Sequence, residues 1–312
     1  MWFKNMFVYR LPKMWNVAKE DIDLSLKSYA HQAPSALEMK TMGFVPPFFE
    51  DEESPFLFVL DSFWLAKLTI ESRILPASVV NQTLMEKLQS IQKEKGFLPN
   101  RKERLDLKES ILEELMPRAF LTSKQMLAWM DVQNGFLLVN AASPNAADSM
   151  IEMLNDAIVR FPLKNLHTEK SPQTVMTQAL LNPENLKDFS LAKHCVLESC
   201  DENKESVRYN NHFLQGGKIQ EEIKAHIQSG KVPKALGLYY KERFSFVLTD
   251  KMQIKNIRLE EDLFKERDDS LSHTEDEKSR FVADFLLMSA EFSQFLPDLI
   301  QFLGGEKNVA SL

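Results

Sequence analysis

Cysteine, glycine and long apolar runs are scarce in this chain of 312 residues, and these shortages exclude several classes of protein. The two cysteines, Cys195 and Cys200, are too few for a secreted disulfide scaffold, and their spacing fits neither a redox pair nor a zinc knuckle. No uninterrupted apolar run approaches the roughly 20 residues of a membrane span, and Lys4 and Arg10 interrupt the apolar opening stretch. We therefore expect a cytoplasmic protein without a membrane partner.

Catalytic motifs are also missing. Gly216-Gly217-Lys218 lacks the upstream glycine and the following Ser or Thr of a phosphate-binding loop, and the six histidines are scattered. We therefore expect a protein that is not an enzyme and needs no cofactor. Asp284 and Glu291, two turns apart on one predicted helix, leave a metal-dependent nuclease as an alternative, although acidic helix faces are ordinarily solvated surface.

Charge is segregated along the chain. The formal net charge is −7, yet residues 87–108 contain seven basic and three acidic residues, and residues 218–243 contain six basic and three acidic ones. Residues 259–284 have the opposite bias, with ten acidic and four basic residues. This pattern suits a basic working surface on an acidic, soluble protein, although charge runs can also be simple solvated faces.

Hydrophobic periodicity predicts an α+β fold with antiparallel sheets and packed helices. The first 75 residues are mainly strand-like, at residues 2–11, 56–60 and 63–74. Two further strands, residues 125–132 and 136–141, flank the turn signal Asn134-Gly135. A helix follows at about residues 145–160, with Asn145 as its predicted cap.

Two amphipathic helices are inserted between these strands. Apolar residues recur at three- and four-residue steps before and after the break at residues 96–100, and Pro117 ends the second helix. Two helices of 15 to 20 residues form a hairpin that would project roughly 25 to 30 Å from the sheet. We expect a projecting arm that carries the first basic cluster.

The remaining part of the chain predicts a second α+β unit. Helices are expected after Ser171-Pro172, from Lys218 to Gly230, and from about Ser279 to Gly304-Gly305, and strands at about residues 207–214, 234–240, 244–249 and 252–259. The acidic residues 260–277 are expected to form a mobile loop. The predicted domains are a central sheet domain (1–75 and 121–165), a finger (76–120) and a base (166–312).

Several ordered segments carry a resemblance to a known family. They are residues 2–5 (WFKN) with Tyr9-Arg10, Met42-Gly43-Phe44-Val45-Pro46-Pro47, Ile74-Leu75-Pro76, Pro117-Arg118-Ala119-Phe120, Trp129-Met130-Asp131 with Asn134-Gly135, residues 226–231 and residues 284–288 through 303–306. In order and spacing they resemble the RdgC family over essentially the whole chain. The resemblance implies a bacterial, nucleoid-associated protein that binds double-stranded DNA with little sequence preference, forms a ring-shaped homodimer around a central hole, and restrains the RecA recombinase by occupying DNA.

The resemblance and the basic clusters together give a set of candidate DNA-binding residues. Arg118 and Phe120 match the family's step at the root of the finger, where Phe120 is expected either as a wedge or as a core residue. Asn211 and His212 stand where the family can carry Lys and Gln, which weakens the expected phosphate contact there. The full set is Lys87, Lys93, Lys95, Arg101, Lys102, Arg104, Lys108, Arg118, Phe120, Asn211, His212, Lys218 and Lys224. A protein-interaction module that docks through the arm is the alternative.

Overall fold

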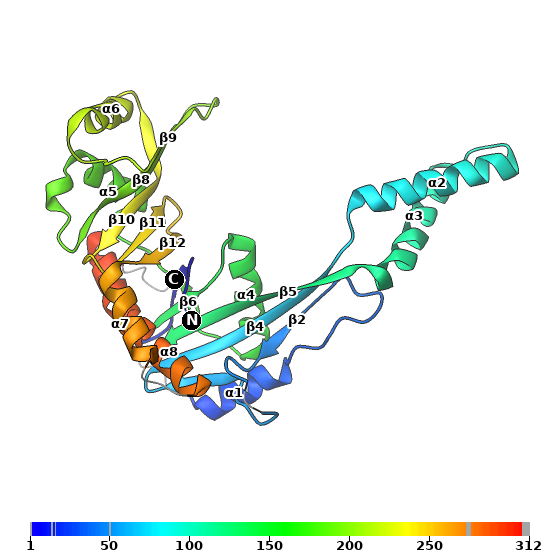
Figure 1. The fold of residues 1–312 in the computed structure, drawn as a ribbon, viewed down its shortest axis with the longest axis horizontal. Helices are drawn as coiled ribbons and strands as arrows, with labels where there is room; N and C mark the ends of the chain where they lie inside the picture. The colour runs from blue at the N-terminus through cyan, green and yellow to red at the C-terminus, as the bar shows by residue number, and fades with distance from the viewer. Residues whose placement is uncertain (1, 14, 16, 50, 273–275, 308–312) are drawn as a thin grey trace.

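The computed structural model describes residues 2–13, 15, 17–49, 51–272 and 276–307. Its central element is a long two-stranded antiparallel ribbon. Strands β4 (Phe63–Ile74) and β5 (Phe120–Asp131) pair without a register shift along their whole length. Figure 1 shows that the ribbon leads from the body of the molecule to a helical hairpin, so that the chain forms an open crescent. The described residues form two antiparallel sheets and eight α-helices, which confirms the predicted α+β class.

The larger sheet is built around this ribbon. Its strand order is β2-β4-β5-β6-β1-β7, and β2 and β3 pair with successive parts of β4. The other strands are β1 (Phe7–Arg10), β2 (Lys40–Val45), β3 (Leu57–Leu60), β6 (Phe136–Val139) and β7 (Lys164–Asn165). The predicted turn at Asn134-Gly135 joins β5 to β6, and Gly135 has a φ of +73°, a conformation that favours glycine.

Within the body of the molecule both faces of the larger sheet are covered, and since successive side chains of a strand point to opposite faces, neighbouring residues enter different cores. Trp64 and Met130 pack with α1 (Lys19–Ser28) and α4 (Pro144–Ala157) in one core cluster. Leu65 and Trp129 belong to the second cluster, with α8 (Glu277–Phe302). Helix α1 was not among the elements predicted from the sequence. The predicted cap of α4 was also wrong, because the side chain of Ser143, rather than Asn145, accepts the hydrogen bond from the Ala146 amide.

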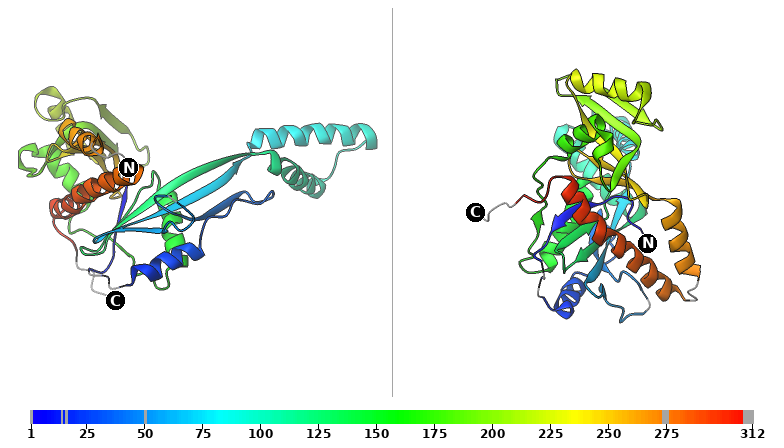
Figure 2. Two further views of the ribbon diagram at one scale, coloured as in Figure 1. Left: turned by 60° about the horizontal axis from the view of Figure 1, so that its bottom comes forward. Right: turned by 90° about the vertical axis from the view of Figure 1, so that its left-hand side faces the viewer.

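The smaller sheet has the strand order β12-β11-β10-β8-β9. Its strands are β8 (Phe189–Ser199), β9 (Ser206–Asn210), β10 (Lys231–Tyr240), β11 (Phe244–Thr249) and β12 (Ile254–Leu259). Helices α5 (Pro172–Leu181), α6 (Gly217–Gln228) and α8 share a core with the inward side chains of this sheet. Figures 1 and 2 show these helices on the outer side of the crescent, which leaves the other face of the sheet toward its opening.

Helix α8 joins the two sheets. The Phe292 ring lies 6.0 Å from the Trp129 ring of the larger sheet, and the Phe295 ring lies 5.1 Å from Phe246 of the smaller sheet. The indole N–H of Trp129 donates a buried hydrogen bond of 2.8 Å to Ser289 Oγ on the same helix. One continuous apolar cluster therefore spans the body of the crescent.

The acidic segment was predicted wrongly. Residues 261–272 form helix α7 (Glu261–Ser272) rather than a loop, whereas residues 273–275 of the predicted loop lie outside the described residues. Leu263 is buried in the core, and Arg267 Nε donates to Asp284 Oδ1 on α8 at 2.6 Å. These contacts hold a strongly charged helix against the body, which its composition alone did not indicate.

The helical hairpin agrees closely with its prediction. It consists of α2 (Ala77–Lys95) and α3 (Arg101–Leu115), and a short 3₁₀ turn, η1 (Met116–Arg118), leads back into β5. Gly96, with a φ of +77°, ends α2, and Asn100 and Glu103 cap α3 reciprocally. Within the described residues of α2 and α3, Val80 and Ile111 alone are buried, so little core stabilises this finger.

No helix within the described ranges is long and apolar enough to cross a membrane. Both cysteines are free: Cys200 is exposed, and burial raises the pKa of the Cys195 thiol to about 12.

Candidate nucleic-acid interface

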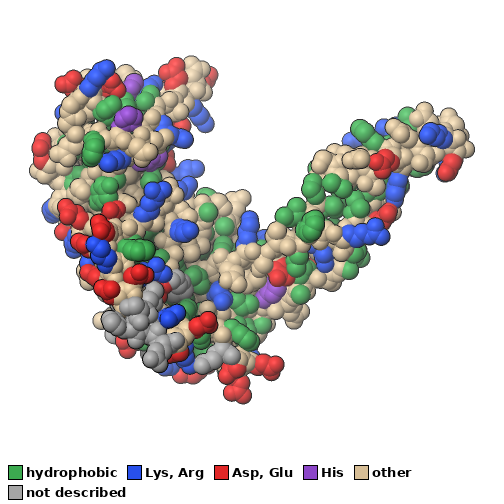
Figure 3. Space-filling view, viewed as in Figure 1, with side chains coloured by type: hydrophobic (Ala, Val, Ile, Leu, Met, Phe, Trp, Pro, Cys, Tyr) green, Lys and Arg blue, Asp and Glu red, His purple; other side chains and the backbone are tan. Residues whose placement is uncertain are grey.

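The candidate residues lie at the two ends of the crescent. The finger carries Lys87, Lys93, Lys95, Arg101, Lys102, Arg104, Lys108 and, at its root, Arg118 and Phe120. The other end carries Asn211, His212, Lys218 and Lys224. Figure 3 shows Lys and Arg side chains on the side of the body that faces the opening of the crescent and, on the finger, mainly along its lower edge and at its tip, whereas Asp and Glu gather mainly on the outer and lower margins of the body.

The positive charge of the finger is concentrated at its tip. Residues 93–104 contain five cations and two carboxylates, whereas the rest of α2 and α3 contains two cations and five carboxylates. Lys93 and Lys95 end α2, Arg101 and Lys102 begin α3, and all four side chains are exposed. The tip can therefore offer a compact set of cations to a polyanion.

Two of the finger cations have structural roles. Lys87 Nζ lies 2.6 Å from Glu114 Oε2 and so ties α2 to α3, and this contact holds the pKa of the Glu114 carboxyl below its usual range. Arg104 Nε donates to the Pro99 carbonyl oxygen at 2.9 Å. Lys87 is therefore partly neutralised, and it is a weaker candidate than the cations of the tip.

The root of the finger exposes an apolar side chain. Phe120 begins β5 and is 83% exposed, and its register partner Ile74 is also exposed. The interpretation of Phe120 as a core residue is thus wrong for this chain. Arg118 precedes it in η1 and is exposed as well.

At the other end, Asn211 and His212 follow β9 and are both exposed. The Asn211 amide donates to the Lys193 carbonyl oxygen at 2.8 Å, which brings Lys193 of β8 beside the position where the family resemblance leads one to expect a lysine. Lys193 was not among the predicted site residues, because β8 was not predicted from the sequence. A strand signal from residues 189–199 would have been needed to find it.

Lys218 and Lys224 lie on α6, which packs through Ile223 into the core on the helical side of the smaller sheet. Lys218 Nζ is 3.7 Å from Glu222 Oε1, one turn along the helix. The fold therefore separates these lysines from the open face of the sheet, although they are close to Asn211 and His212 in sequence.

The carboxylates considered for a nuclease are buried structural residues. Asp284, 4% exposed, accepts from Trp2 Nε1 at 3.0 Å and from Arg267 Nε at 2.6 Å, and Glu291, 7% exposed, accepts from Arg243 Nε at 2.8 Å. The expectation that they form a solvated helix face is wrong. Among the described residues, no group of three or more His, Cys, Asp or Glu side chains is arranged to hold a metal ion.

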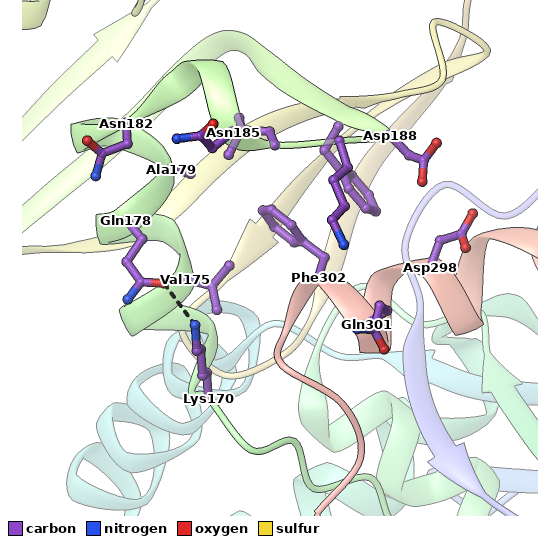
Figure 4. Close-up of a pocket in the computed structure, with 13 residues that line it drawn as sticks. Lys170, Val175, Gln178, Ala179, Asn182, Asn185, Asp188, Asp298, Gln301 and Phe302 are labelled. Atoms are coloured by element: carbon purple, nitrogen blue, oxygen red, sulfur yellow. Dashed lines mark hydrogen bonds between the residues drawn. The ribbon is translucent and has the colours of Figure 1, made fainter.

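A pocket on the outer side of the smaller sheet lies between α5 and the end of α8 (Figure 4). Lys170 donates to Gln178 Oε1 at 3.3 Å on one side, and the rings of Phe189 and Phe302 stack on its floor with centroids 4.6 Å apart. Asp298 at its rim accepts from Lys241 Nζ at 2.8 Å. Because charges of both signs line it, this pocket has no bias toward a polyanion.

Together the fold and the charge distribution define a two-sheet α+β protein with a projecting helical finger, and with basic residues at the finger tip and on the side of the body that faces the opening. The family model described as "Putative exonuclease, RdgC" matches residues 1–306. The chain belongs to the RdgC family, as its sequence motifs predicted.

Relatives support this assignment over the full length. The chain is 40% identical over 308 residues to the recombination-associated protein RdgC of Dechloromonas aromatica, with 98% of each chain covered. It is 37% identical over 307 residues to the protein of the same name from Herminiimonas arsenicoxydans, with 98% of this chain and 99% of the relative covered.

Proposed function

We propose that this protein binds double-stranded DNA without sequence preference, as a ring-shaped homodimer, and that it modulates recombination by limiting the access of RecA to DNA. The observation that carries the proposal is the gathering of basic residues at the finger tip and on the side of the body that faces the opening, in a crescent whose net charge is −7. The name that its relatives bear, recombination-associated protein, agrees with such a role. The proposed place of action is the nucleoid, in the cytoplasm.

The exposed apolar residues of the finger and of the strand ends that carry it support a homodimer. They are Ile74, Val79, Met85, Phe97, Leu98, Leu105, Phe120 and Leu121. A thin helical arm with so many exposed apolar side chains favours coverage by a partner, and a second copy of the same finger offers a self-complementary surface. A contact at each end of two crescents would close a ring.

The chemistry of the candidate residues supports binding that is insensitive to base sequence. Lys and Arg side chains at the finger tip contact phosphates, which position a protein on DNA but carry no direct sequence information. In this proposal the finger (76–120) and the base (166–312) contact DNA, and the central domain (1–75 and 121–165) holds the finger and the base apart.

Fluorescence anisotropy with two unrelated duplexes across a range of salt tests the proposal. Similar affinities on both duplexes, with a steep negative dependence of log K on log salt, are the expected result. Solution mass measured in parallel should correspond to two chains. Binding that is absent at low salt would overturn the proposal and favour the alternative in which the arm docks on a protein partner.

The description of the family model makes exonuclease activity the second candidate. Incubation of end-labelled linear duplex with the protein and Mg²⁺ or Mn²⁺ tests it directly. Release of mononucleotides that disappears in a folded Asp284→Asn variant would establish an activity that uses this carboxylate. Intact DNA under conditions where the protein demonstrably binds it would favour the passive role.

A further inference from the structure

A depression on the open face of the smaller sheet is lined by residues from all five of its strands. Inward side chains such as Leu236, Leu238 and Phe246 belong to the core, so the alternate positions on the same strands face the opening. The depression is lined by Lys193, His194, Asn210, Asn211, Tyr239 and Arg258, with Gly237 and Ser245 between them. Lys193 and His194 are adjacent because a register shift against β10 interrupts the alternation of β8 here.

The lining is cationic in a protein that is acidic as a whole. It includes Lys193 and Arg258 but, among the described residues, no Asp or Glu. Some cations in or beside the same sheet have carboxylate partners, for example Lys234 with Asp250 at 2.9 Å and Arg243 with Glu266 at 2.8 Å. No such ion pair neutralises Lys193 or Arg258 within the described part of the chain, so both charges remain available to an anion.

Contacts within the depression hold several of its side chains in place. Asn210 Oδ1 lies 2.9 Å from His194 Nδ1, and the Lys193 ammonium lies 4.2 Å from the centre of the Phe213 ring. Gly237 also lines the depression. A Cβ on this residue would come within 3.1 Å of the Cβ of His194, so a larger residue would crowd the depression. A pre-positioned set of donors loses little freedom when it binds a ligand.

We propose that this depression binds phosphates of the DNA backbone, with Arg258 as a two-pronged donor and Lys193 as a point charge. The inference rests on the proposed function and extends it, because it gives the duplex a second contact at the opposite end of the crescent from the finger tip. Lys193 then supplies the charge that Asn211 does not.

The test compares a double variant with a matched control. Lys193→Gln with Arg258→Gln removes two cations from the depression, and Lys19→Gln with Arg160→Gln removes two exposed cations beside α1 and α4. At 0.1 M salt each phosphate contact contributes about 0.9 log units, so the first variant should bind roughly 60-fold more weakly, with a salt slope smaller by about 1.8. The control should bind like the unmodified protein.

An unchanged salt slope in the folded first variant, with DNA still bound, would overturn this inference and leave the proposed function standing. Failure of the unmodified protein to bind any duplex would overturn both. Acetylation of the unmodified protein provides a second measurement that depends on no variant: duplex should protect Lys193 from the reagent and leave Lys19 reactive. Equal reactivity of Lys193 with and without bound duplex would also overturn the inference.

Discussion

Ile74 and Phe120 face each other in the last register of the β4–β5 ribbon, and both are exposed at the point where the finger begins. A Phe side chain of this exposure contributes little to the stability of a single chain. Its exposure is instead typical of a residue that a second molecule covers.

Replacement of Phe120 by Ser should therefore weaken self-association and leave the fold intact. We expect the free energy of unfolding of the monomer to change by less than about 0.5 kcal/mol, because the site is solvent-exposed. Sedimentation equilibrium should show a larger dissociation constant. Phe264→Ser, at an exposed position of α7, is the control. A large loss of stability without a change in mass would contradict the proposed role of Phe120.

Charge reversal at the finger tip should weaken DNA binding equally on unrelated sequences. The change to Glu at Lys93, Lys95, Arg101 and Lys102 removes up to four phosphate contacts, so the salt slope should fall by up to about 3.6. Reversal of Lys13, Lys19, Lys27 and Arg160 gives a control with the same residue types and the same change in net charge, at exposed positions away from the finger. If both sets reduce binding alike, net charge rather than the tip governs affinity.

Loss of the hydroxyl of Ser289 should destabilise the body of the protein. Ser289→Ala leaves the buried indole N–H of Trp129 without its partner, at a cost of about 1 to 3 kcal/mol. Urea unfolding monitored by tryptophan fluorescence measures the change. Ser149→Ala, at a half-buried position of α4 whose hydroxyl donates to the Asn145 carbonyl oxygen of the same helix, should have a much smaller effect. Equal stability of the two variants would mean that water replaces the Ser289 hydroxyl.

Acid should weaken the attachment of α7. The Arg243 guanidinium donates to Glu266 and holds the pKa of this carboxyl below its ordinary value of 4.5. The contact therefore stabilises the fold above about pH 4.5, and this contribution is lost as the pH falls through the folded-state pKa. Because Glu266 is largely exposed, the contribution is less than about 1 kcal/mol.

Urea unfolding of the Glu266→Gln variant at pH 7 and pH 3 checks this expectation. The difference in unfolding free energy from the unmodified protein should be present at pH 7 and close to zero at pH 3. Glu261→Gln, on the same helix and paired with Lys265 rather than Arg243, is the control. A difference that grows toward low pH would contradict the assignment.

Parts of the fold with strong local periodicity were predictable from sequence. The finger helices and β4 have regular apolar spacing and clear stop signals, and their predicted bounds agree with the structure to within a few residues. Helix α1 was missed because it buries only Ile22 and Leu26 among its described residues. Strand β8 was missed because register shifts opposite β10 interrupt its alternation.

The candidate interface was predictable only where its charges are close in sequence. The finger tip is a cluster of cations within twelve residues, which composition reveals directly. The depression in the smaller sheet joins Lys193 of β8 to Arg258 of β12 across four strands, and this proximity depends on strand order and on the side that the helices cover. Helix α7 was mistaken for a loop because its main stabilising partners, such as Asp284, come from another helix.

Helix α8 packs against both sheets, and this packing determines where the molecule can bend. Separation of Phe292 from Trp129, or of Phe295 from Phe246, would open the common core, so the body responds to a load as one stiff unit. The outer part of the β4–β5 ribbon has no such support, since its side chains near Ile74 and Phe120 are exposed. Mechanical compliance is therefore concentrated in this stalk, and a force that DNA exerts on the finger would flex the stalk before it distorted the body.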